Sequence, residues 1–298
     1  MSGRRPAGVF APVTTPFDPA TGDVAPERLR GNVSRYLALG LDGIVVAGST
    51  GEASLLDPDE VRRLVGAVRE TVPRDRWLIA GTGAESTRQA VALSAAAAAE
   101  GADLVIVRPP GYYSAAYTTA SLADYYRAVA DASPVPVLVY NIPKYTHVAL
   151  PAALLVELAG HDRIVGVKDS SGDLKNLAAY REAVPRWSVL AGSASLLCAA
   201  LDLGCDGGVV AVSCFAPRPC AELYRAFRAG NRARAETLQQ ALVPLDKEIV
   251  AGLGPGGVKA AMDAAGDGGG LFGGPVRPPL APLSQADRER VAQLVAGD

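Results

Sequence analysis

Short apolar runs alternate with longer segments of helical spacing along most of the chain. The runs are rich in valine, isoleucine and leucine, which is typical of strands buried on both faces of a sheet. In chain order they read GVFAPVTT, GIVVAG, RWLIAGTG, LVIVRP, VPVLVYN, RIVGVKD, WSVLAGS and GGVVAV. The segments between them are rich in alanine and leucine. The pattern therefore predicts helices that alternate with strands over roughly 230 residues, the length of one (β/α)8 unit.

A weak internal repeat supports this order of elements. Four of the predicted helices end in Gly-x-Asp shortly before a strand, at Gly40, Gly101, Gly160 and Gly204. Glycine suits the left-handed residue that ends many helices. The main alternative, a doubly wound open sheet, usually has a glycine-rich phosphate turn after its first strand, whereas APVTTPF follows the first strand here. We therefore predict the α/β class and a (β/α)8 TIM barrel.

The pattern changes after residue 230. Helical spacing continues over residues 231–250, 256–265 and 284–296, and a Gly/Pro-rich stretch separates the last two. We predict a catalytic barrel over residues 1–230 and a small C-terminal helical appendage over residues 231–298.

Composition and charge argue against several classes of partner. The chain has 298 residues, 49% of them hydrophobic, and a net charge of -2. This charge gives no sign of the basic face that nucleic acid or an anionic membrane requires. No apolar run is long enough for a transmembrane helix, and MSGRRPAGVF lacks the apolar stretch of a signal peptide. We predict a cytoplasmic protein with neither a nucleic-acid nor a membrane partner.

Potential metal ligands are few. The two histidines, His147 and His161, have no triad partner nearby, so a structural role is the better interpretation. The cysteines form no CxxC pair and lie in apolar surroundings, which favours buried free thiols. We predict no metal and no cofactor. The cysteines are Cys198, Cys205, Cys214 and Cys220.

Lys168 ends the sixth apolar run, in RIVGVKDSSGDL. One interpretation is a solvated lysine where a strand reaches the surface, because lysine is rarely buried. In a TIM barrel, however, the carboxyl ends of the strands carry the chemistry. The other predicted strand ends read GSTGE, PPGYYS, YNIPKYTH and GSAS, which supply hydroxyls and phenols. An amine in such a water-poor pocket is suited to Schiff-base chemistry on a ketone.

Seven motifs in order carry a family resemblance from about Gly8 to the end: PVTTPF, GSTGE, YYS, YNIP, GVKDSSGD, LAGSA and GPGGVKAAMD with GGPVRPPLAPL. The chain resembles the dihydrodipicolinate synthase / N-acetylneuraminate lyase family of pyruvate-dependent class I aldolases. The resemblance implies that Lys168 forms an imine with pyruvate or another 2-oxo acid and that Tyr140 moves protons. It also implies a small-molecule 2-oxo acid as partner and a homo-oligomer, a tetramer or a dimer.

The same resemblance implies roles for four further residues. Thr50 and Tyr113 would complete a hydroxyl relay, with Tyr113 reaching in from a neighbouring subunit. Ser49 and Thr50 would hold the substrate carboxylate, and the main chain of Val210 in strand eight would contact the keto acid. Simpler roles remain open, since Thr50 could cap the next helix and the tyrosines could merely pack.

One departure bears on the substrate. Dihydrodipicolinate synthases usually have an arginine where YNIPKYTH places Tyr145, and a neighbouring lysine, Lys144, cannot reproduce a bidentate clamp. The segment GTGAEST, the KDSSGD motif and the C-terminal segment resemble more closely the 4-hydroxy-2-oxoglutarate aldolase branch of the family. This resemblance implies cleavage of 4-hydroxy-2-oxoglutarate to pyruvate and glyoxylate, which is our main prediction. The alternatives are dihydrodipicolinate synthesis from pyruvate and aspartate semialdehyde, and a 2-keto-3-deoxy sugar acid aldolase or dehydratase. A metal-dependent aldolase and a non-catalytic keto-acid sensor are hypotheses from other classes.

Overall fold

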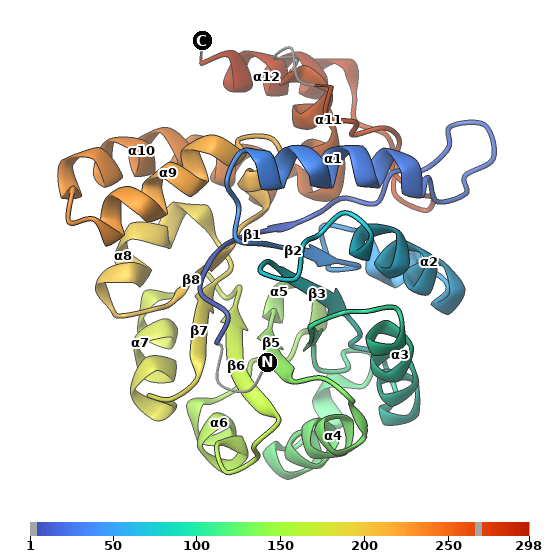
Figure 1. Cartoon of the computed structure of the whole chain (residues 1–298), viewed down its shortest axis with the longest axis vertical. Coiled ribbons are helices and arrows are strands. Elements are labelled where there is room, and N and C mark those ends of the chain that lie inside the picture. The colour runs from blue at the N-terminus through green and yellow to red at the C-terminus, as the bar shows by residue number, and fades with distance from the viewer. Residues whose placement is uncertain (1–4, 266–269, 298) are drawn as a thin grey trace.

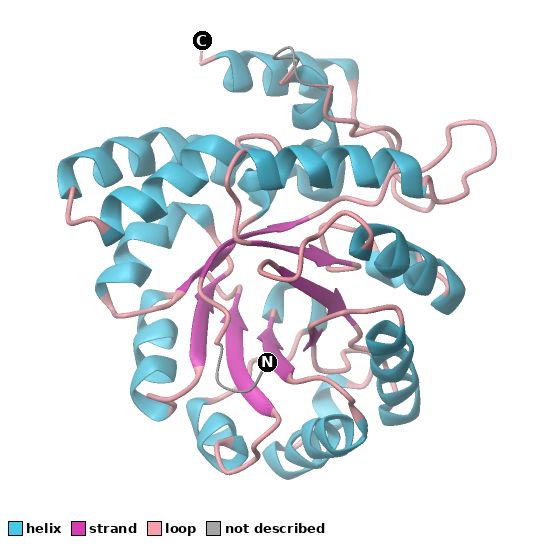
Figure 2. Cartoon of the chain, viewed as in Figure 1, coloured by secondary structure: helices cyan, strands magenta, loops and turns pink. Residues whose placement is uncertain are grey.

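Eight parallel strands close into a barrel at the centre of the molecule (Figures 1 and 2). The computed structural model describes residues 5–265 and 270–297. Each strand pairs with its neighbours in chain order, and the last strand pairs with the first. The predicted (β/α)8 TIM barrel is confirmed. The strands are β1 Gly8–Pro12, β2 Gly43–Val46, β3 Trp77–Gly81, β4 Leu104–Val107, β5 Val137–Asn141, β6 Ile164–Asp169, β7 Ser188–Ala191 and β8 Gly207–Val209.

Helices surround the barrel, and several begin at a residue that caps them (Figure 2). The Ser86 hydroxyl accepts the Gln89 amide, and Asp57 forms a capping box with Glu60. The helices are α1 Pro26–Ala38, α2 Pro58–Arg69, α3 Thr87–Ala99, α4 Thr119–Ala132, α5 Pro143–Thr146, α6 Ala152–Leu158, α7 Leu174–Ala183, α8 Leu197–Asp202, α9 Pro217–Arg228, α10 Arg232–Pro244, α11 Gly252–Ala264 and α12 Gln285–Ala296.

The strands separate two apolar regions. Successive side chains of a strand point to opposite sides, so Phe10 joins the cluster that fills the barrel, whereas Val9 packs in the layer between strands and helices. Lys168 of β6 is in register with Tyr140 of β5 and Leu190 of β7, both of which belong to the interior cluster. Register partners share a face of the sheet, so Lys168 faces the inside of the barrel.

The C-terminal region is helical, as the sequence predicts for most of its length. α10 continues directly into a π-helical segment, Leu245–Ala251, and then into α11. Gly254 interrupts α11 with φ 60° and ψ -148°, a conformation that glycine adopts readily. α12 lies at the edge of the molecule, beyond α1 (Figure 1). The division at residue 230 into two units stays a prediction.

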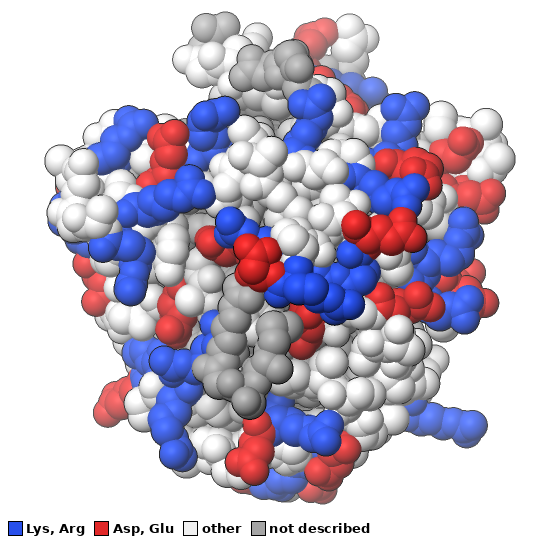
Figure 3. Space-filling model, in the orientation of Figure 1, with Lys and Arg blue, Asp and Glu red and all other residues white. Residues whose placement is uncertain are grey.

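The outer surface is charged and mixed in sign. Lys and Arg side chains alternate with Asp and Glu side chains over the face shown in Figure 3. Among the helices that the structure describes, none has the length and apolar content needed to cross a lipid bilayer.

Candidate active site

Lys168 and Tyr140 meet inside the mouth of the barrel. The side-chain nitrogen of Lys168 lies 3.3 Å from the phenol oxygen of Tyr140 and 4.3 Å from the centre of its ring. Both residues are 6% exposed. The interpretation of Lys168 as a solvated surface lysine is therefore wrong. This pair places a buried amine beside a phenol that can donate or accept a proton.

Asp169 and Asn141, the last residues of β6 and β5, fix the two strand ends to each other. The Asn141 side chain donates to the Asp169 carboxylate at 2.6 Å and accepts the Leu150 amide at 3.0 Å. The Ser171 hydroxyl also donates to Asp169 at 2.6 Å. Because these residues point away from the interior, they hold the strands from outside while Lys168 and Tyr140 face inward. Neither Asn141 nor Asp169 is among the predicted site residues, although both lie in motifs that carry the family resemblance.

The turn after β2 brings two hydroxyls to the mouth of the barrel. Ser49 and Thr50 both line the cavity that contains Lys168. The Thr15 hydroxyl secures the turn by donating to the Gly51 carbonyl at 2.6 Å. Thr50 does not cap α2, because the residue in that position is Asp57.

Gly81 of β3 leaves room for this turn. A Cβ atom at Gly81 would lie 2.0 Å from the carbonyl oxygen of Ala47, so any larger residue would displace the turn. The close approach of the two backbones therefore requires glycine at this position.

A buried ion pair joins the same turn to the C-terminal region. Glu52 and Lys259 have side chains 0% and 1% exposed, and their charged atoms lie 2.5 Å apart. Lys259 also donates to the Pro275 carbonyl at 2.6 Å, and the Arg277 amide donates to Glu52 at 2.8 Å. Burial lowers the pKa of Lys259, against the opposing effect of Glu52. Since ion pairing is strongest away from water, Glu52 is held firmly at the end of the turn.

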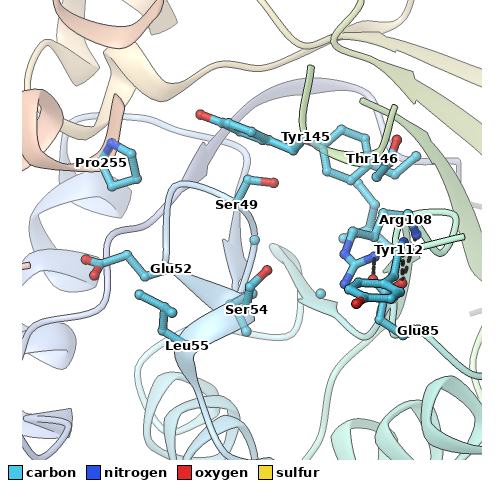
Figure 4. A pocket seen from close by; sticks show the side chains of 18 of the residues that line it. Ser49, Glu52, Ser54, Leu55, Glu85, Arg108, Tyr112, Tyr145, Thr146 and Pro255 are labelled. Carbon is cyan, nitrogen blue, oxygen red and sulfur yellow. Dashed lines mark hydrogen bonds and ion pairs between the residues drawn. The ribbon is translucent and has the colours of Figure 1, made fainter. Parts of the chain in front are cut away.

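Two adjoining cavities open at this end of the barrel. The smaller, of about 290 Å³, contains Lys168, and the larger, of about 740 Å³, is shown in Figure 4. Ser49, Tyr140, Tyr145 and Pro255 line both. The C-terminal region thus forms part of the wall, which the sequence analysis did not anticipate when it described an appendage.

Arg108 and Glu85 lie together on the wall of the larger cavity (Figure 4). Arg108 pairs with Glu85 at 2.8 Å, and the amides of Gly111 and Tyr112 each donate to Glu85 at 2.9 Å. Burial raises the pKa of Glu85, but these hydrogen bonds and Arg108 outweigh it and the pKa is lowered. A charged Glu85 therefore holds the start of the loop that carries the paired tyrosines.

Lys144 and Tyr145 lie on α5, where the sequence analysis expected the substrate to be distinguished. Lys144 donates to the Ala251 carbonyl at 2.9 Å, and its nitrogen is 5.6 Å from the centre of the Tyr145 ring. Tyr145 is 50% exposed, and burial raises the pKa of its phenol. The ring thus presents a neutral phenol between the two cavities.

Tyr113 and Val210 are the two predicted site residues that do not line the Lys168 cavity, although Val209 and Ala211, the neighbours of Val210, do. Tyr113 is 67% exposed, packs edge-on against Tyr112 at 4.9 Å and lines neither cavity. Val210 follows β8 directly. Its amide donates to Phe10 at 3.2 Å, and its carbonyl accepts the Ser213 hydroxyl at 2.7 Å. The roles of both residues stay predictions.

The cysteines and His161 line neither cavity, whereas His147 lines the larger one. All four cysteines are buried and free, and burial raises the pKa of Cys214. His161 contacts Asp131 at 3.0 Å, while His147 ends α5 with φ 55°. Across residues 5–265 and 270–297, no cluster of three or more His, Cys, Asp or Glu side chains is placed to hold a metal ion.

Comparison with known proteins gives matches over almost the whole chain. A family model described as the dihydrodipicolinate synthetase family matches residues 5–297. A DapA-like lyase of Halobacterium salinarum is 40% identical over 281 residues, covering 94% of this chain and 90% of the relative. The 4-hydroxy-tetrahydrodipicolinate synthase of Methanothrix thermoacetophila is 33% identical over 290 residues, covering 97% and 95%. YagE, a prophage protein of E. coli K12 solved in complex with pyruvate, has a TM-score of 0.91 and 29% identity, covering 98% of both chains.

Proposed function

Because this chain belongs to the dihydrodipicolinate synthetase family, we propose that Lys168 forms an imine with pyruvate and that the derived enamine reacts with an aldehyde. Membership makes the chain a Schiff-base-forming, pyruvate-dependent class I lyase or aldolase. The observation that carries the assignment to Lys168 is the buried contact of 3.3 Å with Tyr140 inside the barrel.

The reaction begins when the neutral amine of Lys168 attacks C2 of pyruvate and water is lost. Removal of a proton from C3 converts the imine to an enamine. The C3 carbon then attacks the aldehyde carbon, a proton is added to the aldehyde oxygen, and hydrolysis of the new imine frees the lysine. Tyr140 moves protons in these steps, and Ser49 and Thr50 hold the pyruvate carboxylate. Cleavage is the same sequence in reverse.

Condensation with aspartate semialdehyde is the first candidate for the physiological reaction. Support comes from the relatives, since the synthase of Methanothrix thermoacetophila is 33% identical over nearly the full length of both chains. Lys144, at the edge of the Lys168 cavity, is available as a cation for the aldehyde's carboxylate. This supports the alternative of the sequence analysis more than its main prediction.

Cleavage of 4-hydroxy-2-oxoglutarate is the second candidate, and Tyr145 favours it. A half-exposed phenol at this position cannot supply the two parallel hydrogen bonds of an arginine to a carboxylate. We further propose that the active form is an oligomer, because Tyr113 is exposed in the single chain and does not line the cavity that it is expected to serve.

Trapping of the imine tests the chemistry. Incubation with pyruvate and borohydride should modify one peptide, the one that contains Lys168, and Lys168→Ala should remove the modification. Modification of Lys175 or Lys259, or none, would contradict the mechanism. Activity should survive EDTA, since loss that zinc or magnesium restores is the result expected of a metal-dependent aldolase.

A substrate panel then identifies the aldehyde. It compares condensation of pyruvate with aspartate semialdehyde against pyruvate release from 4-hydroxy-2-oxoglutarate and from a sugar-derived 2-keto-3-deoxy acid. The highest kcat/KM should be that of the condensation. A trapped imine without turnover on any of the three would favour a keto-acid sensor.

A further inference from the structure

The cavity that contains Lys168 holds a second buried charge, the carboxylate of Asp246. Asp246 is 5% exposed and lies at the start of the π-helical segment Leu245–Ala251. Such π-helical turns occur often at functional sites. Neither the motifs nor the proposed mechanism uses this carboxylate.

All hydrogen bonds to Asp246 reach one of its two oxygens. The Ser193 hydroxyl donates to Oδ2 at 2.6 Å, and the Ser195 amide and hydroxyl each donate to Oδ2 at 2.8 Å. Ser193 lines the same cavity as Asp246. Among residues 5–265 and 270–297, no hydrogen bond reaches Oδ1. The loop after β7 therefore fixes the carboxylate by one oxygen and leaves the other for a molecule in the cavity.

No Lys, Arg or His side chain forms an ion pair with Asp246 within the part of the chain that the structure describes, although Lys144 and Lys168 line the same cavity. A buried carboxylate is unfavourable unless it is paired or fully hydrogen-bonded. If Asp246 served only to hold the loop after β7 to the π-helical segment, one uncharged oxygen acceptor at this position would be enough. The free oxygen and the unpaired charge both indicate a ligand that carries a hydrogen-bond donor.

Lys144 supplies the complementary charge to this ligand. Its nitrogen is bonded to the carbonyl of Ala251, five residues beyond Asp246 in the π-helical segment. Residues five apart in a π-helix lie on the same side, one turn from each other. Once Lys168 is consumed as an imine, the charged side chains that line its cavity are Lys144 and Asp246, one of each sign, within the described residues.

We propose that Asp246 determines the choice of aldehyde, by accepting a hydrogen bond from an ammonium or hydroxyl group on the aldehyde's carbon chain. The inference rests on the proposed enamine reaction and adds the recognition of its second substrate. An aldehyde that carries an ammonium group satisfies the charge of Asp246, and one that carries a hydroxyl satisfies its free oxygen. An aldehyde with neither leaves the buried carboxylate unpaired, which is strongly unfavourable.

Two matched pairs of aldehydes test this, each condensed with pyruvate. Aspartate semialdehyde and succinate semialdehyde differ only in an ammonium group, and glyceraldehyde and propanal differ only in hydroxyls. In the wild-type enzyme the donor-bearing member of at least one pair should have a kcat/KM roughly 10- to 100-fold higher, the range expected for a hydrogen bond to a charged group. The pair that responds identifies the donor as ammonium or hydroxyl.

Asp246→Ala and Asp246→Asn should reduce the ratio of kcat/KM between the two members of the responding pair to about one. The asparagine must keep its oxygen toward the Ser195 amide, so it presents an NH2 donor to the cavity where the aspartate presented an acceptor. Because the ratio compares two substrates within one variant, a general loss of activity does not affect it. Gln239→Met is the matched control. Gln239 holds the same loop through Ala194 and lines neither cavity, so its substitution should leave the ratio unchanged.

Borohydride trapping of pyruvate accompanies each measurement. Every variant should give the Lys168 adduct, and loss of the adduct in the Asp246 variants alone would show a role in folding and overturn the proposal. Equal kcat/KM values within both pairs in the wild type would also overturn the proposal. The same holds if both Asp246 variants keep the wild-type ratio. Absence of the adduct in the wild type would instead contradict the proposed function, the formation of an imine between Lys168 and pyruvate.

Discussion

Lys168 and Tyr140 are register partners on neighbouring strands, and their functional atoms lie 3.3 Å apart inside the barrel. The contact is a direct consequence of strand pairing. Each strand alternates inward and outward side chains, so a slip of one residue in either strand would turn one of the two outward. The hydrogen bond from Asn141 to Asp169, one residue further along both strands, stabilises this register.

Replacing the phenol should separate imine formation from proton transfer. We expect Tyr140→Phe to lower kcat by roughly 10²- to 10⁴-fold, the usual contribution of a general acid or base. The variant should still be trapped by pyruvate and borohydride, because Lys168 is intact. Steady-state kinetics and mass spectrometry of the trapped peptide measure the two effects. An unchanged kcat would show that Tyr140 only packs against the lysine.

Mixing two inactive variants should restore activity if Tyr113 serves a neighbouring subunit. Tyr113→Phe and Lys168→Ala each impair every site of a homo-oligomer. After mixed reassembly, some sites combine an intact Lys168 with an intact Tyr113 from the next chain, and activity should return in part. Tyr112→Phe with Lys168→Ala is the parallel control. No recovery in the mixed oligomer would place Tyr113 outside the relay.

Replacing one partner of the buried Glu52–Lys259 ion pair should destabilise the protein more than replacing both partners. Lys259→Met leaves Glu52 charged and unpaired, which should lower the free energy of unfolding by about 3 to 5 kcal/mol. The double variant Glu52→Gln with Lys259→Met removes both charges and should recover much of the loss. Urea unfolding of the wild type, Lys259→Met, Glu52→Gln and the double variant measures the coupling between the two side chains. Additive losses would show that the two side chains act independently.

An arginine at position 145 should favour an aldehyde that carries a carboxylate. We expect Tyr145→Arg to raise kcat/KM for condensation with aspartate semialdehyde by roughly tenfold or more, through a charge-assisted contact. Lys144→Met should lower the same parameter in the wild-type background if Lys144 already binds that carboxylate. The KM for pyruvate is the internal control, because neither change touches the imine. If Tyr145→Arg lowered this kcat/KM and Lys144→Met raised it, the carboxylate of the aldehyde would not bind beside α5.

Acid should weaken the attachment of the C-terminal region through Glu60. Two hydrogen bonds of 2.6 Å from Arg277 are the main cause that lowers the pKa of Glu60 below the 4.5 of a free glutamate side chain. The resulting stabilisation is complete above that value and is lost as the pH falls through the lower pKa of the folded state. In thermal unfolding at a series of acid pH values, the melting temperature should therefore fall less steeply with decreasing pH for Glu60→Gln than for the wild type. Parallel declines would contradict this.

The sequence was sufficient for the barrel because its strands are buried on both faces, which leaves short, nearly uniform apolar runs. It was also sufficient to single out Lys168, since a lysine at the end of such a run is unusual. The C-terminal helices follow from equally local signals, and so do three of the four predicted glycine helix ends, since Gly40, Gly101 and Gly204 have positive φ and Gly160 does not. Each of these features depends on residues that are close in the chain.

The contributions of the C-terminal region depend on contacts between distant residues, which one sequence does not reveal. Asp246 and Lys259 lie in segments of ordinary helical pattern, and their partners Ser193 and Glu52 are far away in the chain. The placement of Tyr113 at the site is implied by the family resemblance alone, for another reason. Its proposed partner site belongs to a second chain, so neither the sequence nor a single folded copy brings it to Lys168.

The Glu52 to Lys259 pair sets an order of events during synthesis. When β8 has left the ribosome the barrel can close, but the turn that holds Ser49 and Thr50 still lacks its cation and the cavity lacks the wall formed by Pro255. Glu52 must then stay hydrated, which keeps water in the site. Once α11 has emerged and docked, Lys259 pairs with Glu52 and Pro255 completes the wall, so the site is completed only after the barrel itself.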